Sequence, residues 1–399
     1  MGGAAEPAPV RGVIHQVGPM PDGNERPRLH RLKVEGFRSI AQLEITFSNL
    51  DVMIGPNGAG KSNLIGFLRL LGFMLSSDTG LGLFVGRSGG AAALLHDGPK
   101  ISQEIAAEIV IETSAGTNEY VFRLQVAAGD TLVFAEEKFR FRQRGRSTAQ
   151  TWLAFGAGHR SPGILGVSED NRRRTQRTVL SLLRGLSVYQ FHDTSAEAPP
   201  KRKSRIDAGR FLRGDAGNLA SFLFNMRDAQ PGYYERIVKT IRLIAPFFDD
   251  FDLEEDEGYT LLRWREVGSD ELFGPSQISD GTLRAMALVT LLLQPPTSMP
   301  PMLVIDEPEL GLHPVGLQIV SGLVRAASQS RQCLIATQAS AFLDALDPEN
   351  VIVVERRGRS STFTRLEAAS LKTWLDEYDL AELWDMNLLG GRPASLAAE

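Results

Sequence analysis

The stretch GPNGAGKS, Gly55 to Ser62, decides the fold of this chain. It fits the pattern G-x-x-x-x-G-K-[ST] at every fixed position. The apolar run Leu50–Ile54 before it predicts a buried strand. After it, apolar residues recur at helical spacing: Leu64, Ile65, Phe67, Leu68, Leu71 and Met74. The alternative is a chance glycine-rich turn, but a strand before the loop and a helix after it favour a phosphate-binding loop.

Such a loop binds a nucleotide through its backbone. The glycines let N–H groups converge on phosphate oxygens, and the following helix points its positive end at the same place. Lys61 is expected to neutralise the β- and γ-phosphates, and the Ser62 hydroxyl to ligate Mg²⁺. The sequence therefore predicts ATP and Mg²⁺ as cofactors, with the nucleotide held by Gly55, Pro56, Asn57, Gly58, Ala59, Gly60, Lys61, Ser62 and Asn63.

The composition narrows the class of protein. The chain has 399 residues, of which 43 % are hydrophobic, and a formal net charge of −5, so no global basic field argues for nucleic acid. The single cysteine, Cys333, cannot form an internal disulfide, which fits a cytoplasmic location. No apolar run approaches the ~20 residues of a membrane helix, so we expect no membrane. Residues 1–28 are rich in Gly, Ala and Pro and are expected to be disordered.

A second candidate site element lies about 240 residues after the loop, counted along the sequence. Met302–Ile305 predicts a buried parallel strand, and Asp306 and Glu307 follow it directly. Ligands of parallel sheets bind at the carboxyl ends of the strands. Asp306 is therefore expected to hold Mg²⁺ and Glu307 to polarise the attacking water. An ordinary strand exit with surface acids is the alternative.

The run Ile278–Arg284 comes shortly before that strand. Ser279 is a good N-cap for an apolar helix over Leu283–Leu293. A Ser-x-Gly helix start presents N–H groups and a hydroxyl to an anion, so Ser279 and Gly281 are candidate nucleotide contacts. A plain capped helix is the alternative.

Two further basic features are candidate ligand contacts. Arg38 lies between expected strands Leu32–Gly36 and Leu43–Phe47 and is either a nucleotide contact or an exposed turn residue. On an expected strand, alternate residues would form a basic stripe that could follow a DNA backbone: Lys138, Arg140, Arg142, Arg144 and Arg146. The alternative is a solvated face balanced by acids such as Glu136 and Glu137.

The order of these motifs resembles ABC-type ATPase heads, and more closely the RecF/SMC/OLD-like group of stand-alone ATPases. The segments that carry the resemblance are Phe37–Ser39, Gly55–Ser62, Ser279–Arg284, Ile305–Pro314 and Ala336–Gln338. It implies an α/β P-loop NTPase with a mixed or parallel central sheet, an antiparallel β flank and an inserted α+β lobe. The implied boundaries are a head over 29–355, an insertion over 83–275 and a helical tail over 356–399 packed on the head.

The resemblance also implies roles for single residues. Ser279 and Gly281 would contact the γ-phosphate bound to the opposite subunit of a homodimer, and Glu309 to His313 would cross the interface. Gln190 would link the insertion to Mg²⁺. Gln338 stands where such heads often have histidine, and its amide cannot titrate near neutral pH. The implied catalytic residues are Glu307, Lys61 and Gln338, and the implied metal ligands are Ser62, Asp306 and Gln190.

These expectations describe an ATP-dependent switch in DNA repair, recombination or anti-phage defence. It would act with DNA or a separate effector protein such as a nuclease. One alternative is the nucleotide-binding subunit of an ABC transporter. The long insertion, Asp280 in the signature segment and Gln338 count against it. The other is a clamp or regulator in which ATP binding alone matters.

Overall fold

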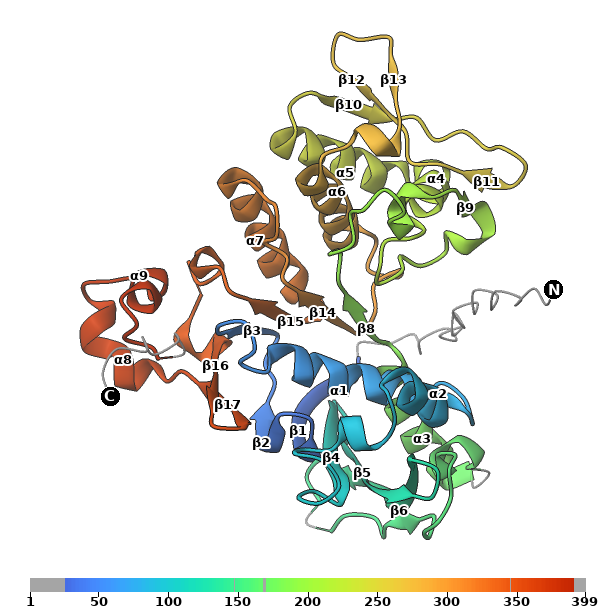
Figure 1. Cartoon of the computed structure of the whole chain (residues 1–399), viewed down its shortest axis with the longest axis vertical. Coiled ribbons are helices and arrows are strands. Elements are labelled where there is room, and N and C mark those ends of the chain that lie inside the picture. Colours follow the sequence, from blue (N-terminus) through green and yellow to red (C-terminus); the bar gives the residue numbers. More distant parts are fainter. Residues whose placement is uncertain (1–25, 147, 168–169, 345, 391–399) are drawn as a thin grey trace, which may run out of the picture.

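The structure is a computed structural model that describes residues 26–146, 148–167, 170–344 and 346–390. Most of the segment expected to be disordered, residues 1–28, lies outside the described part. Two six-stranded sheets form the body, and a smaller lobe stands above them (Figure 1). Within the described residues, no helix has both the length and the apolar composition that crossing a bilayer requires.

The central sheet is mixed: one edge strand, the last in the chain, runs antiparallel to its neighbour, and the other five strands run parallel. Its strands, in spatial order, are β17 (Ser360–Arg365), β16 (Val351–Arg357), β3 (Leu50–Ile54), β15 (Gln332–Thr337), β14 (Met302–Asp306) and β8 (Leu186–Tyr189). The expected boundary at residue 355 falls inside β16, and β17 pairs antiparallel with β16 beyond it. The head sheet therefore continues to Arg365.

The inner strands of this sheet are buried on both faces. In β3, Met53 enters one hydrophobic cluster, while Val52 and Ile54 enter the other. β14 and β15 divide in the same way, as the two-residue period of a strand requires. This explains why each strand reads as a continuous apolar run.

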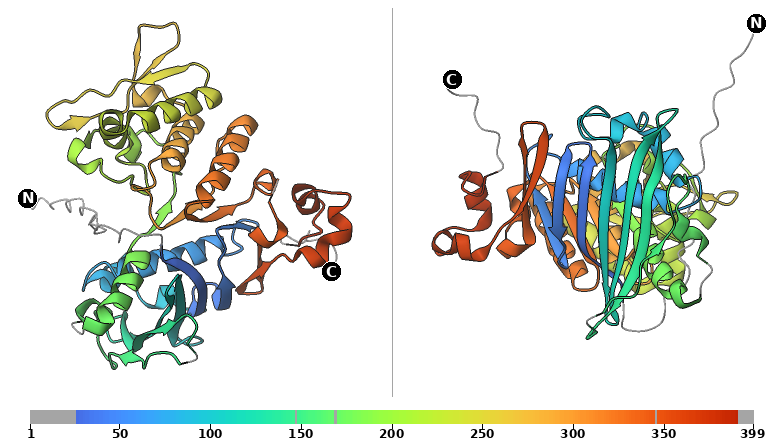
Figure 2. Two further views of the ribbon diagram at one scale, coloured as in Figure 1. Left: turned by 180° about the vertical axis from the view of Figure 1, so that it is seen from behind. Right: turned by 90° about the horizontal axis from the view of Figure 1, so that it is seen from below.

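The second sheet is antiparallel and faces α1 (Lys61–Met74), which follows the phosphate loop. Its order is β2 (Ile40–Thr46), β1 (Arg28–Phe37), β4 (Glu104–Thr113), β5 (Gly116–Ala127), β6 (Thr131–Gln143) and β7 (Leu153–Ala154). Phe67 of α1 packs edge-on against Phe37 at 5.3 Å and is stacked with Phe122 at 6.5 Å. The long strands lie side by side in Figure 2 (right). Helices α2 (Gly80–Arg87) and α3 (Asp170–Arg184) complete this half.

The upper lobe lies between β8 and β14 in the chain (Figure 1). It contains α4 (Leu219–Ala229), α5 (Pro231–Ile244), α6 (Asp280–Leu293) and five short strands: β9 (Ser204–Arg205), β10 (Phe248–Phe251), β11 (Tyr259–Thr260), β12 (Trp264–Glu266) and β13 (Leu272–Phe273). The stretch Tyr259–Glu266 contains two separate strands, because β11 pairs with β9 while β12 pairs with β10 and β13.

The C-terminal region contains α7 (Pro314–Ser328), which precedes β15, and two short helices after β17. These two helices are α8 (Ala368–Leu375) and α9 (Leu380–Asp385). Asp379 begins α9 with a reciprocal cap: its carboxylate accepts from Glu382 N, and Glu382 accepts from Asp379 N.

Candidate nucleotide-binding site

The phosphate loop connects β3 to α1, and its glycines are required by geometry. Gly58 and Gly60 have φ values of +78° and +119°. A Cβ on Gly60 would lie 2.0 Å from Ser361 Oγ, and one on Gly55 would lie 2.2 Å from Val354 O. Side chains at these positions would therefore displace the loop.

Lys61 points back over the loop. Its ammonium donates to the carbonyls of Gly55 and Pro56, the latter at 3.2 Å. The residue is only 4 % exposed, and burial lowers its pKa, an effect that the nearby Glu307, Glu309 and Asp306 oppose. The acids at the end of β14 are therefore close enough to Lys61 to act on it electrostatically.

A hydroxyl cluster supports the loop from behind. Ser361 Oγ donates to Ala59 O at 2.6 Å and lies 2.6 Å from Ser39 Oγ, which accepts from Asn63 Nδ2 at 2.6 Å. The cluster joins the β1–β2 turn, the loop and β17. Sequence reasoning assigned Asn63 to the nucleotide and missed Ser39 and Ser361 as supports.

Arg38 occupies the β1–β2 turn with φ +48°. Its guanidinium lies over the Phe37 ring at 5.3 Å and close to Gly66 of α1. Burial, and secondarily Arg69, lower its pKa. Arg38 is thus half-buried against α1 and is not a fully exposed turn residue.

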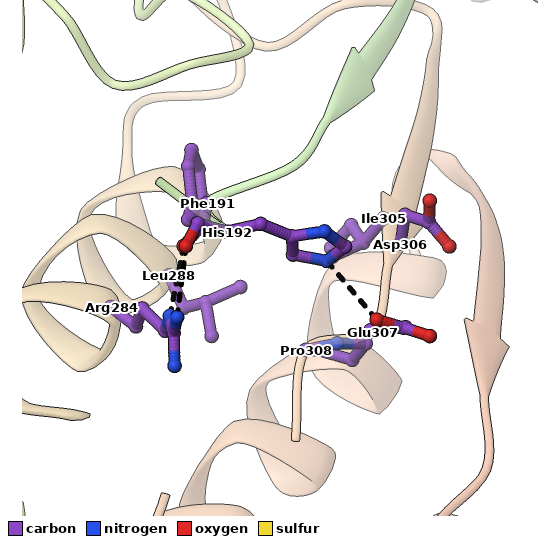
Figure 3. A pocket seen from close by; sticks show the side chains of 8 residues that line it. All are labelled: Phe191, His192, Arg284, Leu288, Ile305, Asp306, Glu307 and Pro308. Atoms are coloured by element: carbon purple, nitrogen blue, oxygen red, sulfur yellow. Dashed lines mark hydrogen bonds and ion pairs between the residues drawn. The ribbon is translucent and has the colours of Figure 1, made fainter. Parts of the chain in front are cut away.

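Asp306 and Glu307 end β14 at the carboxyl edge of the sheet, as the sequence predicted (Figure 3). Glu307 has φ +49° and donates its N–H to Ala336 O at 2.7 Å, so its backbone is held in an uncommon conformation. Its Oε1 accepts from Gln338 Nε2 at 3.0 Å. Gln338 N donates to Glu309 Oε1 at 2.7 Å, which ties the two strand exits together.

Gln190 follows β8, the neighbour of β14. Its Nε2 lies 3.2 Å from Asp306 Oδ2 and 3.1 Å from His192 Nδ1, while its Oε1 accepts from Arg69 Nη2 at 2.8 Å. His192 Nε2 lies 3.4 Å from Glu307 Oε2 (Figure 3). Sequence reasoning missed His192 and Arg69, although His192 stands two residues after the predicted Gln190.

Burial and then Glu307 raise the pKa of Asp306, while His192, Arg69 and Lys61 lower it. Burial also raises the pKa of Glu309. Three carboxylates thus crowd one edge of the sheet, and cations from α1 offset their charge.

The donor set fits Mg²⁺. The Ser62 hydroxyl and the Asp306 carboxylate are hard oxygen donors. The structure does not present the predicted Gln190 ligand in this way, because the Gln190 side-chain oxygen accepts from Arg69 and its nitrogen faces Asp306. The described residues contain no group of three or more His, Cys, Asp or Glu side chains that could hold a metal ion by themselves. Mg²⁺ sites of P-loop proteins need none, because phosphate oxygens and water complete the shell.

Ser279 and Gly281 begin α6 on the upper lobe. Ser279 Oγ caps the helix by accepting from Thr282 N at 3.2 Å. A Cβ on Gly281 would lie 2.1 Å from Gly311 O, so the helix start packs on the loop after β14. Among the described residues, no hydrogen bond joins Ser279 or Gly281 to the phosphate loop of the same chain.

Arg284, in the second turn of α6, joins three parts of the site. Its guanidinium donates to Phe191 O and His192 O at 2.9 Å each (Figure 3). It also donates to Leu310 O at 3.3 Å. The helix start, the exit of β8 and the loop after β14 are therefore linked by one side chain.

The predicted basic stripe lies only partly on a strand. β6 ends at Gln143, so Arg144 and Arg146 lie beyond it. Carboxylates pair with four of its cations: Lys138 with Glu136, Arg140 and Arg142 with Glu119, and Arg144 with Glu112. Glu137, expected as a solvated neighbour, is instead buried and accepts from Tyr120 Oη at 2.9 Å. The positive charge of the stripe is therefore largely balanced within the chain.

Comparisons with known proteins agree with this geometry. One similar structure is a crystal structure of an SMC head bound to the C-terminal winged-helix domain of ScpA. The match covers 86 % of this chain and 99 % of that chain, with 18 % sequence identity and a TM-score of 0.55. A second structure is an SMC head domain with an extended coiled coil bound to the C-terminal domain of ScpA from Pyrococcus furiosus. Its match covers 88 % of this chain and 99 % of that chain, with 15 % sequence identity and a TM-score of 0.53. No curated protein matches the chain.

These structural likenesses establish an SMC-head type of P-loop fold, as the sequence predicted. A sequence model of one family matches residues 52–150 and 170–344, which include the phosphate loop, Ser279 and the Asp306–Glu307 pair. The chain belongs to that family, described as "AAA domain, putative AbiEii toxin, Type IV TA system".

Proposed function

We propose that this protein binds ATP with Mg²⁺, hydrolyses it slowly, and uses the nucleotide to close a homodimer. The observation that carries the proposal is the convergence of two distant motifs. Lys61 of the phosphate loop lies within electrostatic reach of Asp306, Glu307 and Glu309 at the end of β14. This is the arrangement that phosphoryl transfer to water requires.

Each side chain has a role in that reaction. Lys61 and the loop N–H groups neutralise the β- and γ-phosphates. Ser62 and Asp306 hold Mg²⁺, which neutralises charge on the phosphate oxygens. Glu307 accepts the proton of the attacking water, and Gln338 orients the Glu307 carboxylate through its hydrogen bond.

The homodimer completes the site in this proposal. Ser279 and the N–H groups at the start of α6 would face the γ-phosphate bound to the other copy. Ser279 is exposed, and Arg284 links its helix to the exit of β8 beside Asp306. A movement of α6 on dimer closure would thus be transmitted through Arg284 to the region of Asp306 and Glu307.

Sizing of a Glu307→Gln variant tests the proposal. This variant keeps the size of the side chain and removes the base, so bound ATP persists. We expect a dimer with Mg-ATP and a monomer with Mg-ADP, with Lys61→Ala as the matched control that stays monomeric. A Glu307→Gln variant that binds Mg-ATP and remains monomeric would contradict the dimer.

DNA repair, recombination and anti-phage defence remain the proposed settings, with a nuclease-like effector as partner. Binding of DNA through Lys138, Arg140, Arg142, Arg144 and Arg146 is the weaker part, because four of these cations are paired. Glu119→Gln would release Arg140 and Arg142. If the stripe binds duplex DNA, this variant tightens binding and steepens its salt dependence, and a five-site charge reversal abolishes it.

Two alternative functions, a clamp that only binds ATP and a transporter subunit, predict different experimental results. Full biological activity of Glu307→Gln would favour a clamp that needs binding alone. Copurification of a membrane permease would favour the transporter subunit.

A further inference from the structure

Three large apolar side chains are exposed on α8 and on the turn that follows α9. Trp374 of α8, and Met386 and Leu388 just after α9, are each 45 % exposed. The ring of Trp374 also contacts the half-buried ring of Tyr378, at 6.4 Å between centroids. One exposed apolar residue is ordinary on a protein surface, but several on one short segment favour a contact surface for another molecule. We name the exposed side chains of residues 374–388 the tail surface.

The segment that carries the tail surface is packed onto the head on its other side. Leu371, Leu380 and Trp384 are buried in the hydrophobic cluster that also contains residues of β3 and β15. Ser340 Oγ donates to Asp385 Oδ2 at 3.3 Å. Figures 1 and 2 show α8 and α9 at the margin of the molecule, next to β16 and β17. The exposed side chains are therefore supported from behind and open to a partner.

The same segment is strongly acidic. Residues 368–390 contain one cation, Lys372, and five acids, all of them exposed: Asp376, Glu377, Asp379, Glu382 and Asp385. Asp379 and Glu382 cap the start of α9. Within the described ranges, no ion pair engages Asp376, Glu377, Asp379 or Glu382. The segment that exposes the apolar side chains therefore carries negative charge that the described chain does not balance.

The pKa of Asp344 reflects the crowding of this charge. Burial and then Asp379 raise the pKa of Asp344, and Arg325 opposes them. Asp385 and Glu382 raise it further. Like charges repel one another, so cations bound here would lower the electrostatic free energy of the surface. The charge favours a basic occupant and disfavours DNA and anionic lipid.

We propose that the tail surface is a docking site for a partner protein, which binds through a segment of apolar side chains flanked by lysine or arginine. Trp374 is the anchor, because tryptophan is enriched among the few residues that dominate binding at interfaces. The carboxylates face the cations of the partner, which fixes the register and raises the rate of association. The proposal goes beyond the ATPase, because the tail surface lies outside the nucleotide site and docking on it needs no nucleotide.

Binding of two synthetic peptides in the absence of nucleotide tests the proposal. One is a fluorescein-labelled amphipathic helix of leucine and lysine with about 14 residues, near the length at which an isolated helix forms. The other has glutamate in place of each lysine. We expect the full chain to bind the lysine peptide and not the glutamate peptide, as measured by fluorescence anisotropy. Trp374→Ser is expected to weaken binding by ~10-fold or more, and Asp376→Asn with Glu377→Gln to weaken it and reduce its salt dependence.

The upper lobe supplies matched controls for these variants. Val267→Ser removes a side chain that is 64 % exposed. Asp270→Asn with Glu271→Gln removes two exposed carboxylates that no ion pair engages in the described part of the chain. Both controls are expected to bind the lysine peptide within about twofold of the wild type. Equal losses in the controls and the tail-surface variants, or no binding by the wild type, would overturn the proposal.

Two further measurements distinguish other occupants. Sizing of the nucleotide-free wild type at rising concentration is expected to show no dimer that Trp374→Ser removes; such a dimer would assign the tail surface to a second copy of the chain. A chain that ends at Gly390 is expected to bind the lysine peptide as the full chain does. A gain of ~10-fold or more on this truncation would assign the surface to residues 391–399. Either result would overturn the proposal. Thermal unfolding of each variant is expected to match the wild type, because the changed side chains are exposed.

Discussion

Gln338 Nε2 donates to Glu307 Oε1 at 3.0 Å. The two residues come from neighbouring parallel strands, and the pairing of Asp306 with Ala336 places both side chains just past the edge of the sheet. Gln338 is further fixed by its own N–H, which donates to Glu309 Oε1. Glu307 is thus oriented by a side chain that cannot change its charge.

The Glu307 carboxylate is the proposed base, so its replacement is expected to have the largest effect on turnover. Glu307→Gln is expected to lower the steady-state ATPase rate by ~10²–10⁴-fold, the usual contribution of a general base. Gln338→Ala is expected to lower it less, by ~10-fold, because the base remains and only its orientation is lost. Phosphate release under saturating Mg-ATP measures both.

Both variants are expected to retain ATP binding, and Lys61→Ala is expected to lose it. A Glu307→Gln variant with the wild-type rate would show that another group activates the water.

The sequence was sufficient to predict the parts of the site that lie within single motifs. The phosphate loop, Asp306, Glu307 and the capped start of α6 all lie where their local patterns predicted. Glycine conformations, strand exits and helix caps are local consequences of residue type. The positions of these motifs could therefore be predicted without knowing the contacts between them.

The supporting contacts could not be predicted, because they join residues far apart in the chain. Ser361 supports Ala59 across 302 positions, and Arg69 reaches Gln190 across 121. Neither Ser361 nor Arg69 has a distinctive neighbourhood in the sequence. For the basic stripe, the sequence suggested nearby acids as the alternative, and Glu136 does pair with Lys138. It could not identify Glu119 and Glu112, because they lie on β5 and β4 and not beside the stripe in the chain.

The hydroxyl cluster behind the loop predicts that Ser361 contributes to ATP affinity without touching the nucleotide. Ser361→Ala leaves Ala59 O without its 2.6 Å donor in a buried site, at a cost of ~1–3 kcal/mol to stability. We expect weaker ATP binding and a lower Tm, as measured by titration of a fluorescent analogue and by thermal unfolding.

The neighbouring Ser360→Ala is the matched control, because Ser360 lies near His96 and not near the loop. Equal losses in both variants would mean that the cluster has no specific role in nucleotide binding.

The pKa of Asp306 predicts how the stability of the chain without nucleotide depends on pH. Folding raises this pKa through burial and Glu307, so the folded chain holds the proton more tightly than the unfolded chain. The ionised carboxylate therefore costs stability above its folded pKa, and the cost disappears as the pH falls below its unfolded value. Asp306→Asn is expected to raise the Tm by roughly 2 °C in mildly alkaline buffer, about what 1 kcal/mol gives in a large chain.

The gain is expected to shrink as the buffer is made acidic, while ATPase activity is lost at every pH. A gain in Tm that grew toward acidic pH would have the wrong sign and would reject the burial of a charged Asp306 as its cause.

The sharing of each site between two copies can be tested by mixing two inactive variants. Lys61→Ala removes the loop contact and leaves Ser279 intact, whereas Ser279→Arg blocks the start of α6 and leaves Lys61 intact. In a mixed dimer, one site receives both defects and the other receives neither. Equal amounts give half mixed dimers with one working site each, so about a quarter of the wild-type ATPase rate should return on mixing. Activity that stays at the sum of the separate variants would mean that Lys61 and Ser279 do not serve one nucleotide across the interface.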